Sequence, residues 1–452
     1  MEVIKEIETR RGANLKLNGI AEKIIEKSPS VANYALRPDD FFGTIPKLCL
    51  KEGSKVLAGS PVFYNKKNPD IKIVSPVSGT IKTIERGPKR KIELIIIEPS
   101  KKQDPIKHQV KGWENMDISD LKALLMESGN WPFIHQRPYG VMANPLDIPK
   151  SIFVTTAKTD PLHEDFNFVL KNEQKEFQLG IDLLNKFVDQ PVFLGIDKSY
   201  PGYFESIKGV QHYSFKGPHP AGNLSFHIQK LSPINMGDRI WTVNPEDVVN
   251  LGRFLTSGIF SSQRTIAVSG NAVQNPKYFK TKIGAELAPF IKNVAVNEDK
   301  VRVINGDVLT GIIADVSGHL GYFNNLVTII PEGSHYRMFG WLPFKDNKIL
   351  SLSNTSLSRF INRNGFEVDT NLNGEERALV VTGEMEKIFP LDIFPMQLIK
   401  ACMVEDIEKM EALGIYEVVT EDFGLVDYAN TSKLEAQEII RHGIELMINE
   451  VG

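Results

Sequence analysis

The spacing of apolar residues changes three times along this 452-residue chain, so one hydrophobic pattern cannot describe all of it. Up to about residue 105, apolar and polar residues alternate around glycine turns. From Ser151 short apolar runs alternate with helical spacing, after Ser262 strand patterns return, and the last stretch is helical. The chain is also about three times as long as the ~150 residues of a typical domain. We therefore predict an α/β multidomain protein in which each segment buries its own core.

The first segment, 1–105, has the pattern of a β-sandwich. Leu50–Phe63 places two glycines six residues apart among alternating apolar positions, and Val74–Glu98 repeats the order of strand, glycine turn and strand. Two similar halves of this kind are typical of an interlocked sandwich, and a hairpin between them is expected at Tyr64–Ile73.

The second segment, 106–260, has the pattern of an α/β domain. Residues 99–111 are polar and indicate a linker, and a helix is expected to begin at Asp117 or Ser119. Farther on, predicted strands alternate with predicted helices, which favours a parallel sheet with helices on its faces. The strands are expected at 151–156, 191–197 and 239–243, and the helices at 173–188, at 224–231 and from Pro245.

The third segment, 261–340, has the mixed pattern of a small β/α domain. Arg264–Thr281 reads as a strand, a glycine-rich turn and a second strand. A helix is predicted at 285–293, and further strands at 300–307 and 325–333. A unit of about 80 residues lies within the usual size range of a small domain.

The fourth segment, 341–452, is predicted to be mainly helical because its apolar residues recur every three or four positions. Ser432 and Glu435 have the spacing of a capping box at the start of the last helix. The periodic apolar residues are Ile399, Met403, Ile407 and Met410, followed by Ala436, Ile440, Ile444 and Met447.

Composition excludes several classes of protein. The net charge is −3 and the pI is about 6.4, so there is no overall basic field, and no nucleic-acid partner is expected. The two cysteines, Cys49 and Cys402, exclude a disulfide scaffold and any iron–sulfur or cysteine-based zinc site held by this chain alone. The longest apolar runs are far shorter than the ~20 residues of a membrane span, and MEVIKEIETRRG has no signal-peptide core. We expect a cytosolic chain, or one held at a membrane by another protein.

Charge is distributed unevenly along the chain. Lys82–Lys102 contains seven basic and three acidic residues, whereas Glu384–Gly452 contains fifteen acidic and five basic residues. One end of the molecule therefore suits anionic phosphates and the other repels them, although both could be ordinary solvated faces. The candidates for contact with a partner or a lipid surface are Arg86, Lys89, Arg90 and Lys91.

The sequence contains no recognisable catalytic constellation. There is no GxxxxGK loop followed by Ser or Thr, no GxSxG and no GxGxxG. Thr155–Leu162, after the first α/β strand, lacks the glycines of a dinucleotide-binding loop. His219 and His227 are the closest candidates for a shared metal ion, and ordinary hydrogen-bonded side chains are the favoured interpretation. We predict no catalytic residue and no bound metal.

Two segments remain candidates for ligand contact. Gly217–Ile228 is a Gly/Pro turn that opens a helix, so it forms either an anion site or, as we favour, a rigid connection. Ser128–Gly140 combines flat apolar rings with hydrogen-bond donors, which suits a planar, carbonyl-bearing ligand such as a quinone. The alternative is an interdomain core built from the same aromatic residues. The quinone-contact candidates are Trp131, Phe133, His135, Gln136 and Arg137.

Four runs, in order, resemble one known family, the A subunit of the bacterial sodium-translocating NADH:quinone oxidoreductase. They are KKNPDIKIVSPVSGTIKTIERGPKRK, SGNWPFIHQRPYG, GPHPAG and VSGNAVQNP. The resemblance implies a biotinyl/lipoyl-like β domain, a Rossmann-like α/β domain, a β-grasp domain of the ligand-binding type and C-terminal helices. It also implies a peripheral subunit on the cytoplasmic face of the bacterial inner membrane, in a six-subunit complex that reduces quinone with NADH and exports Na⁺.

The departures from related proteins imply a subunit without its own cofactor. SGNWPFIHQRPYG stands where related electron-transport subunits hold FMN with a GGAGFP-like loop, and Phe423–Glu435 lacks their cluster-binding cysteines. Lys66 and Lys67 lack the MKM context of a lipoylated hairpin. Flavins, a 2Fe-2S cluster and NADH are then expected in other subunits, and the quinone-site membrane subunit is the expected main partner. The alternatives are a flavin or iron–sulfur subunit of a ferredoxin:NAD-type oxidoreductase, and a lipoyl or biotin carrier.

Overall fold

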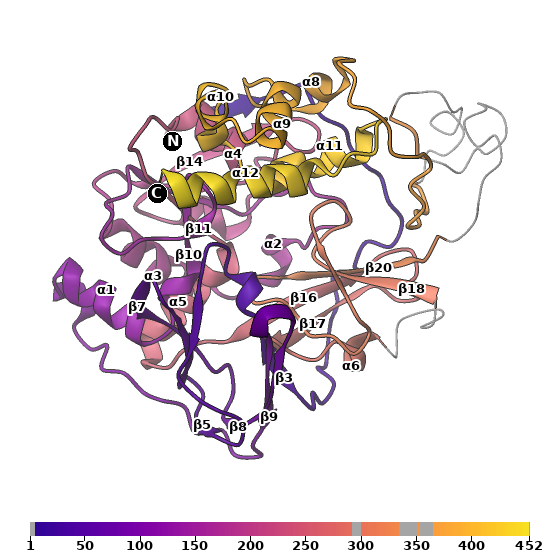
Figure 1. Cartoon of the computed structure of the whole chain (residues 1–452). Helices are drawn as coiled ribbons and strands as arrows, with labels where there is room; N and C mark the ends of the chain where they lie inside the picture. The colour runs from indigo at the N-terminus through magenta and orange to yellow at the C-terminus, as the bar shows by residue number, and fades with distance from the viewer. Residues whose placement is uncertain (1–4, 292–299, 334–349, 353–364, 452) are drawn as a thin grey trace.

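The computed structural model describes residues 5–291, 300–333, 350–352 and 365–451, and in these ranges the strands form four sheets (Figure 1). The predicted boundary at residues 340–341 lies outside the described residues. None of the described helices is both long enough and apolar enough to cross a membrane.

Two small antiparallel sheets form the β domain of the first segment. The three-stranded sheet has the order β4 (Pro46–Leu48), β6 (Pro61–Asn65) and β7 (Asn68–Val74). The four-stranded sheet has the order β3 (Tyr34–Leu36), β9 (Ile92–Pro99), β8 (Gly79–Arg86) and β5 (Lys55–Val56). Alternate residues of both sheets, such as Phe63, Ile73 and Ile95, are completely buried between them. The hairpin predicted at Tyr64–Ile73 is confirmed, because β6 and β7 pair around a turn at Lys66 and Lys67.

The first 26 residues contribute strands to other sheets, although the predicted first domain begins at residue 1. β1 (Lys5–Glu8) pairs in parallel with β14, and β2 (Ile25–Glu26) pairs in parallel with β17. Ile7 is buried with Phe153 and Tyr213 of the α/β domain. The local pattern of so short a strand carries no information about which sheet it joins, so the sequence could not reveal this crossing.

A seven-stranded sheet forms the centre of the α/β domain. Its order is β1-β14-β13-β12-β15-β10-β11, with β10 and β11 antiparallel to their neighbours and the other strands parallel. The prediction of a parallel sheet with intervening helices is therefore confirmed. The remaining strands are β10 (Ile134–Arg137), β11 (Val141–Met142), β12 (Ser151–Thr155), β13 (Val192–Gly195), β14 (Val210–Lys216) and β15 (Ile240–Val243).

Two glycines let the helices α3 (Gln174–Asn185) and α5 (Pro245–Ser257) pack backbone against backbone. A Cβ atom on Gly180 would collide with the Val248 carbonyl oxygen, and one on Gly252 would collide with the Glu176 carbonyl oxygen. α5 begins with Pro245 as predicted. The other helices of this domain are α1 (Ile118–Glu127), whose N-cap is Asp117, α2 (Phe166–Val169) and α4 (Leu224–Leu231).

A six-stranded mixed sheet lies beside the α/β domain (Figure 1). Its order is β19-β18-β20-β16-β17-β2, and the predicted strand pair over Arg264–Thr281 is the antiparallel pair β16–β17. The predicted helix 285–293 appears as the short α6 (Ala288–Ile291), and its last two residues lie outside the described residues. The strands are β16 (Gln263–Ser269), β17 (Lys277–Lys282), β18 (Val301–Asn305), β19 (Ile312–Ala314) and β20 (Leu326–Pro331).

The C-terminal helices share an apolar core and lie together at the top of Figure 1. The predicted capping box of the last helix is wrong. That helix begins at Ala436, beyond both residues of the box, and the Asp427 carboxylate accepts its first backbone N–H at 2.5 Å. The helices are α8 (Glu384–Ile388), α9 (Pro395–Met403), α10 (Ile407–Ala412), α11 (Gly424–Ala429) and α12 (Ala436–Glu450).

Candidate functional site

A cleft opens where the seven-stranded sheet reverses its strand order. The chain leaves β12 towards β13 on one side, while β15 lies on the other side of β12. In open α/β sheets ligands bind in the crevice outside the carboxyl ends of such strands. The residues after β12 and β15 form one wall of a cavity of about 210 Å³ at this point. They are Lys158, Asp160, His163, Glu164 and Asn244.

The opposite wall comes from the six-stranded sheet. Gly306 follows β18 with a φ of 107°, a backbone conformation that favours glycine. Asp307 then closes a tight turn, because its carboxylate accepts the backbone N–H groups of Leu309 at 2.7 Å and Thr310 at 3.2 Å. The cleft therefore lies between two domains, and its second wall is Asn305–Asp307, Thr310–Ile312 and Phe323–Leu326.

The cleft contains one ammonium group facing several carboxyl groups. Lys158 Nζ lies 2.8 Å from Glu164 Oε1, and the Glu164 side chain is only 2% exposed. Burial by itself lowers the pKa of Lys158, but the charges of Glu164, Asp160 and Asp307 outweigh it and raise that pKa. Burial, followed by the charge of Asp160, raises the pKa of Asp307. Lys158 is thus held in its charged form and is already paired.

Buried polar contacts attach the C-terminal helices beside this cleft. Arg137 Nη2 donates to Glu421 Oε1 at 3.0 Å, and the Asn223 side-chain amide donates to Asp422 Oδ1 at 3.0 Å. The Asp422 carboxylate also interacts with the Ser225 hydroxyl, at the start of α4. The N-terminus of α4, the predicted anion site within Gly217–Ile228, therefore already has a carboxylate of the same chain beside it.

The histidines of that segment have ordinary hydrogen bonds. His219 Nδ1 lies 3.2 Å from Thr159 Oγ1 and 3.5 Å from Asp160 Oδ1, and burial lowers the pKa of His219. His227 lies 2.9 Å from the Tyr213 hydroxyl and 2.8 Å from the Ala221 carbonyl oxygen. Across the described ranges, no group of three or more His, Cys, Asp or Glu side chains is arranged to hold a metal ion.

Three of the five quinone-contact candidates are part of the core. Trp131 is completely buried, packs edge-on against Trp241 and donates to the Ala143 carbonyl oxygen at 2.7 Å. Phe133 is also completely buried and stacks on Phe260 with 5.8 Å between ring centroids. Gln136 uses its amide to accept from Trp241 Nε1 and to donate to Asp147. These three side chains are closed to a ligand in this conformation.

The other two candidates, His135 and Arg137, lie on the opposite pleat of β10. The His135 ring is 4.6 Å from the ring of Phe323, which lines the cleft. Burial, followed by the charge of Arg137, lowers the pKa of His135 to about 4, so its imidazole is neutral near pH 7. Arg137 Nε and Nη1 are buried without a hydrogen-bond partner among the described residues. The predicted strand therefore adjoins the cleft through one of its two faces.

Most of the cleft lacks a signal in the local sequence. Thr155–Leu162 supplies Lys158 and Asp160, but it has none of the glycines by which a dinucleotide loop is recognised. The Asn-Gly-Asp run after β18 is a turn signal, and it is the one local feature that points to the second wall.

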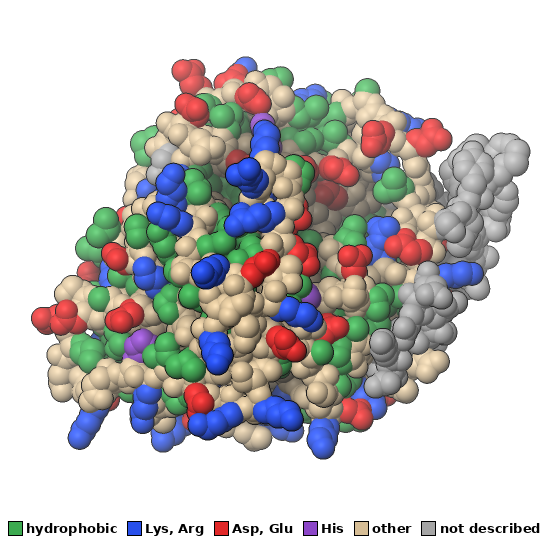
Figure 2. Space-filling model, turned by 60° about the horizontal axis from the view of Figure 1, so that its bottom comes forward, with side chains coloured by type: hydrophobic (Ala, Val, Ile, Leu, Met, Phe, Trp, Pro, Cys, Tyr) green, Lys and Arg blue, Asp and Glu red, His purple; other side chains and the backbone are tan. Residues whose placement is uncertain are grey.

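The predicted basic surface is the exposed turn between β8 and β9. Arg86, Lys89, Arg90 and Lys91 are all exposed, and Lys91 Nζ pairs with Asp39 at 2.7 Å. Figure 2 shows the side of the molecule on which the four-stranded sheet lies, where many Lys and Arg side chains gather. Lys66 and Lys67 are also exposed, at the tip of the β6–β7 hairpin.

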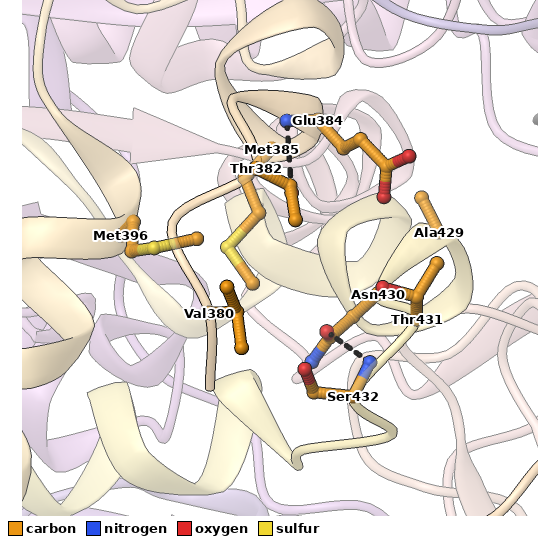
Figure 3. Close-up of a pocket in the computed structure, with 9 residues that line it drawn as sticks. All are labelled: Val380, Thr382, Glu384, Met385, Met396, Ala429, Asn430, Thr431 and Ser432. Carbon is orange, nitrogen blue, oxygen red and sulfur yellow. Dashed lines mark hydrogen bonds between the residues drawn. The ribbon is translucent and has the colours of Figure 1, made fainter. Parts of the chain in front are cut away.

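A second, much smaller cavity lies among the C-terminal helices (Figure 3). Its volume of about 10 Å³ has room for roughly one water molecule. Ser432 donates its backbone N–H to Asn430 Oδ1 at 2.9 Å across one side of it. The cavity lies beside the loop in which related proteins carry cluster-binding cysteines. It is lined by Val380, Thr382, Glu384, Met385, Met396 and Ala429–Ser432.

The domains of this chain match known family models in order. Residues 7–100 match the NqrA N-terminal barrel-sandwich hybrid domain, residues 116–260 the NqrA second alpha/beta domain, and residues 265–315 the NQRA C-terminal domain. The fold and the interdomain cleft therefore define a multidomain α/β protein that begins with a barrel-sandwich hybrid. Its Rossmann-like and β-grasp assignments stay predictions.

Proteins from several bacteria are similar to this chain along almost its whole length. Three of them carry the name of the A subunit of the Na(+)-translocating NADH-quinone reductase. The protein of Rhodopirellula baltica is 32% identical over 98% of both chains. That of Neisseria meningitidis is 30% identical over 98% of this chain and 100% of its own, and that of Alcanivorax borkumensis 31% identical over 97% and 98%. This chain belongs to the NqrA family, the A subunits of the Na⁺-translocating NADH-quinone reductase.

One solved structure, the NAD⁺-reducing nickel–iron hydrogenase in the air-oxidized state, aligns with 77% of this chain and 67% of its own. Its sequence identity is 12% and its TM-score 0.38. That score does not establish a common fold.

Proposed function

We propose that this chain is the peripheral NqrA component of a six-subunit complex that reduces quinone with NADH and exports Na⁺. It lies on the cytoplasmic face of the bacterial inner membrane and binds other subunits, above all the membrane subunit with the quinone site. The name shared by relatives over nearly the whole chain supports this role.

The chain itself holds no redox cofactor, so on its own it has no NADH:quinone reductase activity. Two observations support this part of the proposal. Trp131 and Phe133 fill the core where a flavin loop is found in related proteins. Cys49 lies in the β domain and Cys402 in the C-terminal helices, so the two thiols do not form a pair. Flavins, the 2Fe-2S cluster and NADH belong to the other subunits of the complex.

Quinone contacts this chain in the interdomain cleft, on its way to or from the membrane subunit. The observation that carries this is the cavity of about 210 Å³ at the switch point, which Phe323 shares with the predicted strand β10. A planar ring can pack against the half-buried Phe323 ring, while polar groups of both walls meet its oxygen atoms. His135 and Arg137 supply the back of this wall.

We expect the substitution Phe323→Ala to raise the KM for quinone of the reassembled complex about tenfold and to leave kcat nearly unchanged. Losing an aromatic contact costs about 1 kcal/mol beyond the buried area, and this chain takes no part in electron transfer. Photoreactive quinone labelling of the cleft peptides should fall in parallel. Quinone-dependent NADH oxidation and peptide mass spectrometry measure the two effects.

Phe394→Ala is the matched control, since this ring is 64% exposed at the start of α9 and does not line the cleft. It should leave KM and labelling at their original values. If Phe323→Ala also leaves both unchanged while the circular dichroism spectrum is native, quinone does not use this cleft.

The basic turn between β8 and β9 contributes to holding this chain on the membrane complex. Reversing Arg86, Lys89 and Arg90 to Glu should weaken membrane retention about a hundredfold at low salt. Each basic residue near an anionic surface contributes about 1 kcal/mol, and salt screens the attraction. Co-sedimentation of the chain with inverted membrane vesicles over a salt series measures this.

Equal reversals at Lys171, Lys175 and Lys208, exposed on the α/β domain, give the same change of net charge and should leave retention intact. If both triple variants lose retention equally, only the net charge matters. Equal retention of all three proteins at every salt concentration would show that the turn is an ordinary solvated surface.

A further inference from the structure

We propose that the interdomain cleft selects a ligand that donates hydrogen bonds, so that it holds the reduced quinol in preference to the quinone. This inference rests on the proposed quinone contact in the cleft and adds which redox form is bound. It follows from the direction in which the open polar atoms of the wall can hydrogen-bond.

The Asn325 side chain offers an oxygen to the cleft. Its Nδ2 donates to Glu246 Oε2 and to the Thr265 carbonyl oxygen, and both of those partners can only accept. The amide therefore cannot be flipped without losing both bonds, which assigns the remaining atom as Oδ1. Asn325 is 4% exposed and lines the cavity, and Oδ1 has no partner among the described residues. A buried, unpaired acceptor of this kind is costly until a donor reaches it.

His163 and Asp160 add further acceptors to the same wall. His163 Nδ1 lies 2.9 Å from the Glu164 carbonyl oxygen, so Nδ1 carries the hydrogen atom of this bond. In the neutral imidazole Nε2 then presents a lone pair. Asp160 lines the cavity with a side chain that is 24% exposed, and a carboxylate only accepts.

The main cationic donor of the cleft is already bound to the protein. Lys158 Nζ is paired with Glu164 Oε1 at 2.8 Å, and the carboxyl groups of Asp160 and Asp307 also line the cavity. One positive charge facing three carboxyl groups leaves a net negative cavity. A quinone, whose two oxygens can only accept, meets an unfavourable potential there, whereas the two hydroxyl groups of a quinol can donate to it.

The difference between the two redox forms should be large enough to measure. A hydrogen bond to a charged acceptor is worth more than one between neutral groups, and leaving it unmade costs the desolvation of the carboxylate. We expect the quinol to bind at least tenfold more tightly than the quinone of the same ring. The chain would then act on the product side of quinone reduction, as a holding site for the reduced ring.

The test measures binding of ubiquinol-1 and ubiquinone-1 to the purified full chain under anaerobic conditions, by isothermal titration calorimetry. Asp160→Asn keeps the shape of the side chain and removes its charge. We expect this variant to lose about tenfold in affinity for the quinol and to keep or increase its affinity for the quinone. Asp315→Asn, an exposed carboxylate of the same six-stranded-sheet domain, should change neither affinity. Thermal unfolding of each variant verifies the fold.

The outcomes separate the two proposals. If the quinone binds as tightly as the quinol, or Asp160→Asn affects both forms equally, the selectivity is overturned and quinone contact in the cleft survives. If neither form binds the native chain up to millimolar concentration, the quinone site in this cleft fails, and the selectivity fails with it.

Discussion

Replacing Arg264 with leucine should lower the free energy of unfolding by about 3–5 kcal/mol, because it leaves a buried carboxylate without its counter-ion. Arg264 is fully buried, pairs with Asp247 at 2.5 Å and donates to the Tyr322 carbonyl oxygen at 3.0 and 3.2 Å. It therefore joins α5 of the α/β domain to the six-stranded sheet. Urea unfolding followed by tryptophan fluorescence measures the change.

The matched control is Arg302→Leu, which removes an exposed ion pair with Glu332. Because water screens that pair, the variant should lose no more than about 1 kcal/mol. The interpretation of Arg264 as the buried link between the two domains would be wrong if both variants lost the same amount. Since the two domains form the walls of the cleft, Arg264→Leu should also lower the affinity for any ligand bound between them.

Raising the pH from about 4 to about 6 should weaken the attachment of the C-terminal helices, through Asp422, by about 3 kcal/mol. Burial, followed by the charge of Glu421, raises the pKa of Asp422 to about 6, although Arg137 lowers it in part. In the unfolded chain this carboxyl group loses its proton near pH 4. The folded protein thus binds more protons than the unfolded one over this interval, so stability falls as the pH rises.

Asp422→Asn should remove this part of the pH dependence, since an amide does not titrate. Urea unfolding of both proteins at pH 4.5 and pH 7.5 gives the comparison, and the difference between them should shift by about 3 kcal/mol. Asp392→Asn, an exposed carboxylate of the same helical domain, serves as the control and should behave as the native chain does. An identical pH dependence in all three proteins would contradict the role given to Asp422.

Repeating local patterns are sufficient to predict much of the fold. The β6–β7 hairpin, the alternation of β12, α3 and β13, and the start of α5 at Pro245 each depend on residues close together in the chain. The partners of β1 and β2 depend on residues about two hundred positions away, and no local pattern contains them.

The candidate site is predictable only in part, for a geometric reason. Ser128–Gly140 reads in the sequence as one surface, but successive side chains of a strand point to opposite faces. Gln136 therefore points into the core, while its neighbours His135 and Arg137 point the other way. The cleft itself unites Lys158–Glu164, Asn244 and Asn305–Leu326, and their meeting depends on two domains packing together.

The pairing of β1 with β14 and of β2 with β17 has a consequence for the synthesis of this protein. The ribosome makes β1 and β2 first, yet their partner strands end only at Lys216 and Lys282. At roughly 5–20 residues per second, the N-terminal segment waits roughly ten to fifty seconds for them. Until then the outer edges of both sheets are unfinished, and unpaired strand edges recruit other chains. The nascent protein is thus most prone to aggregate late in translation, when both sheets exist and their edges still await the oldest part of the chain.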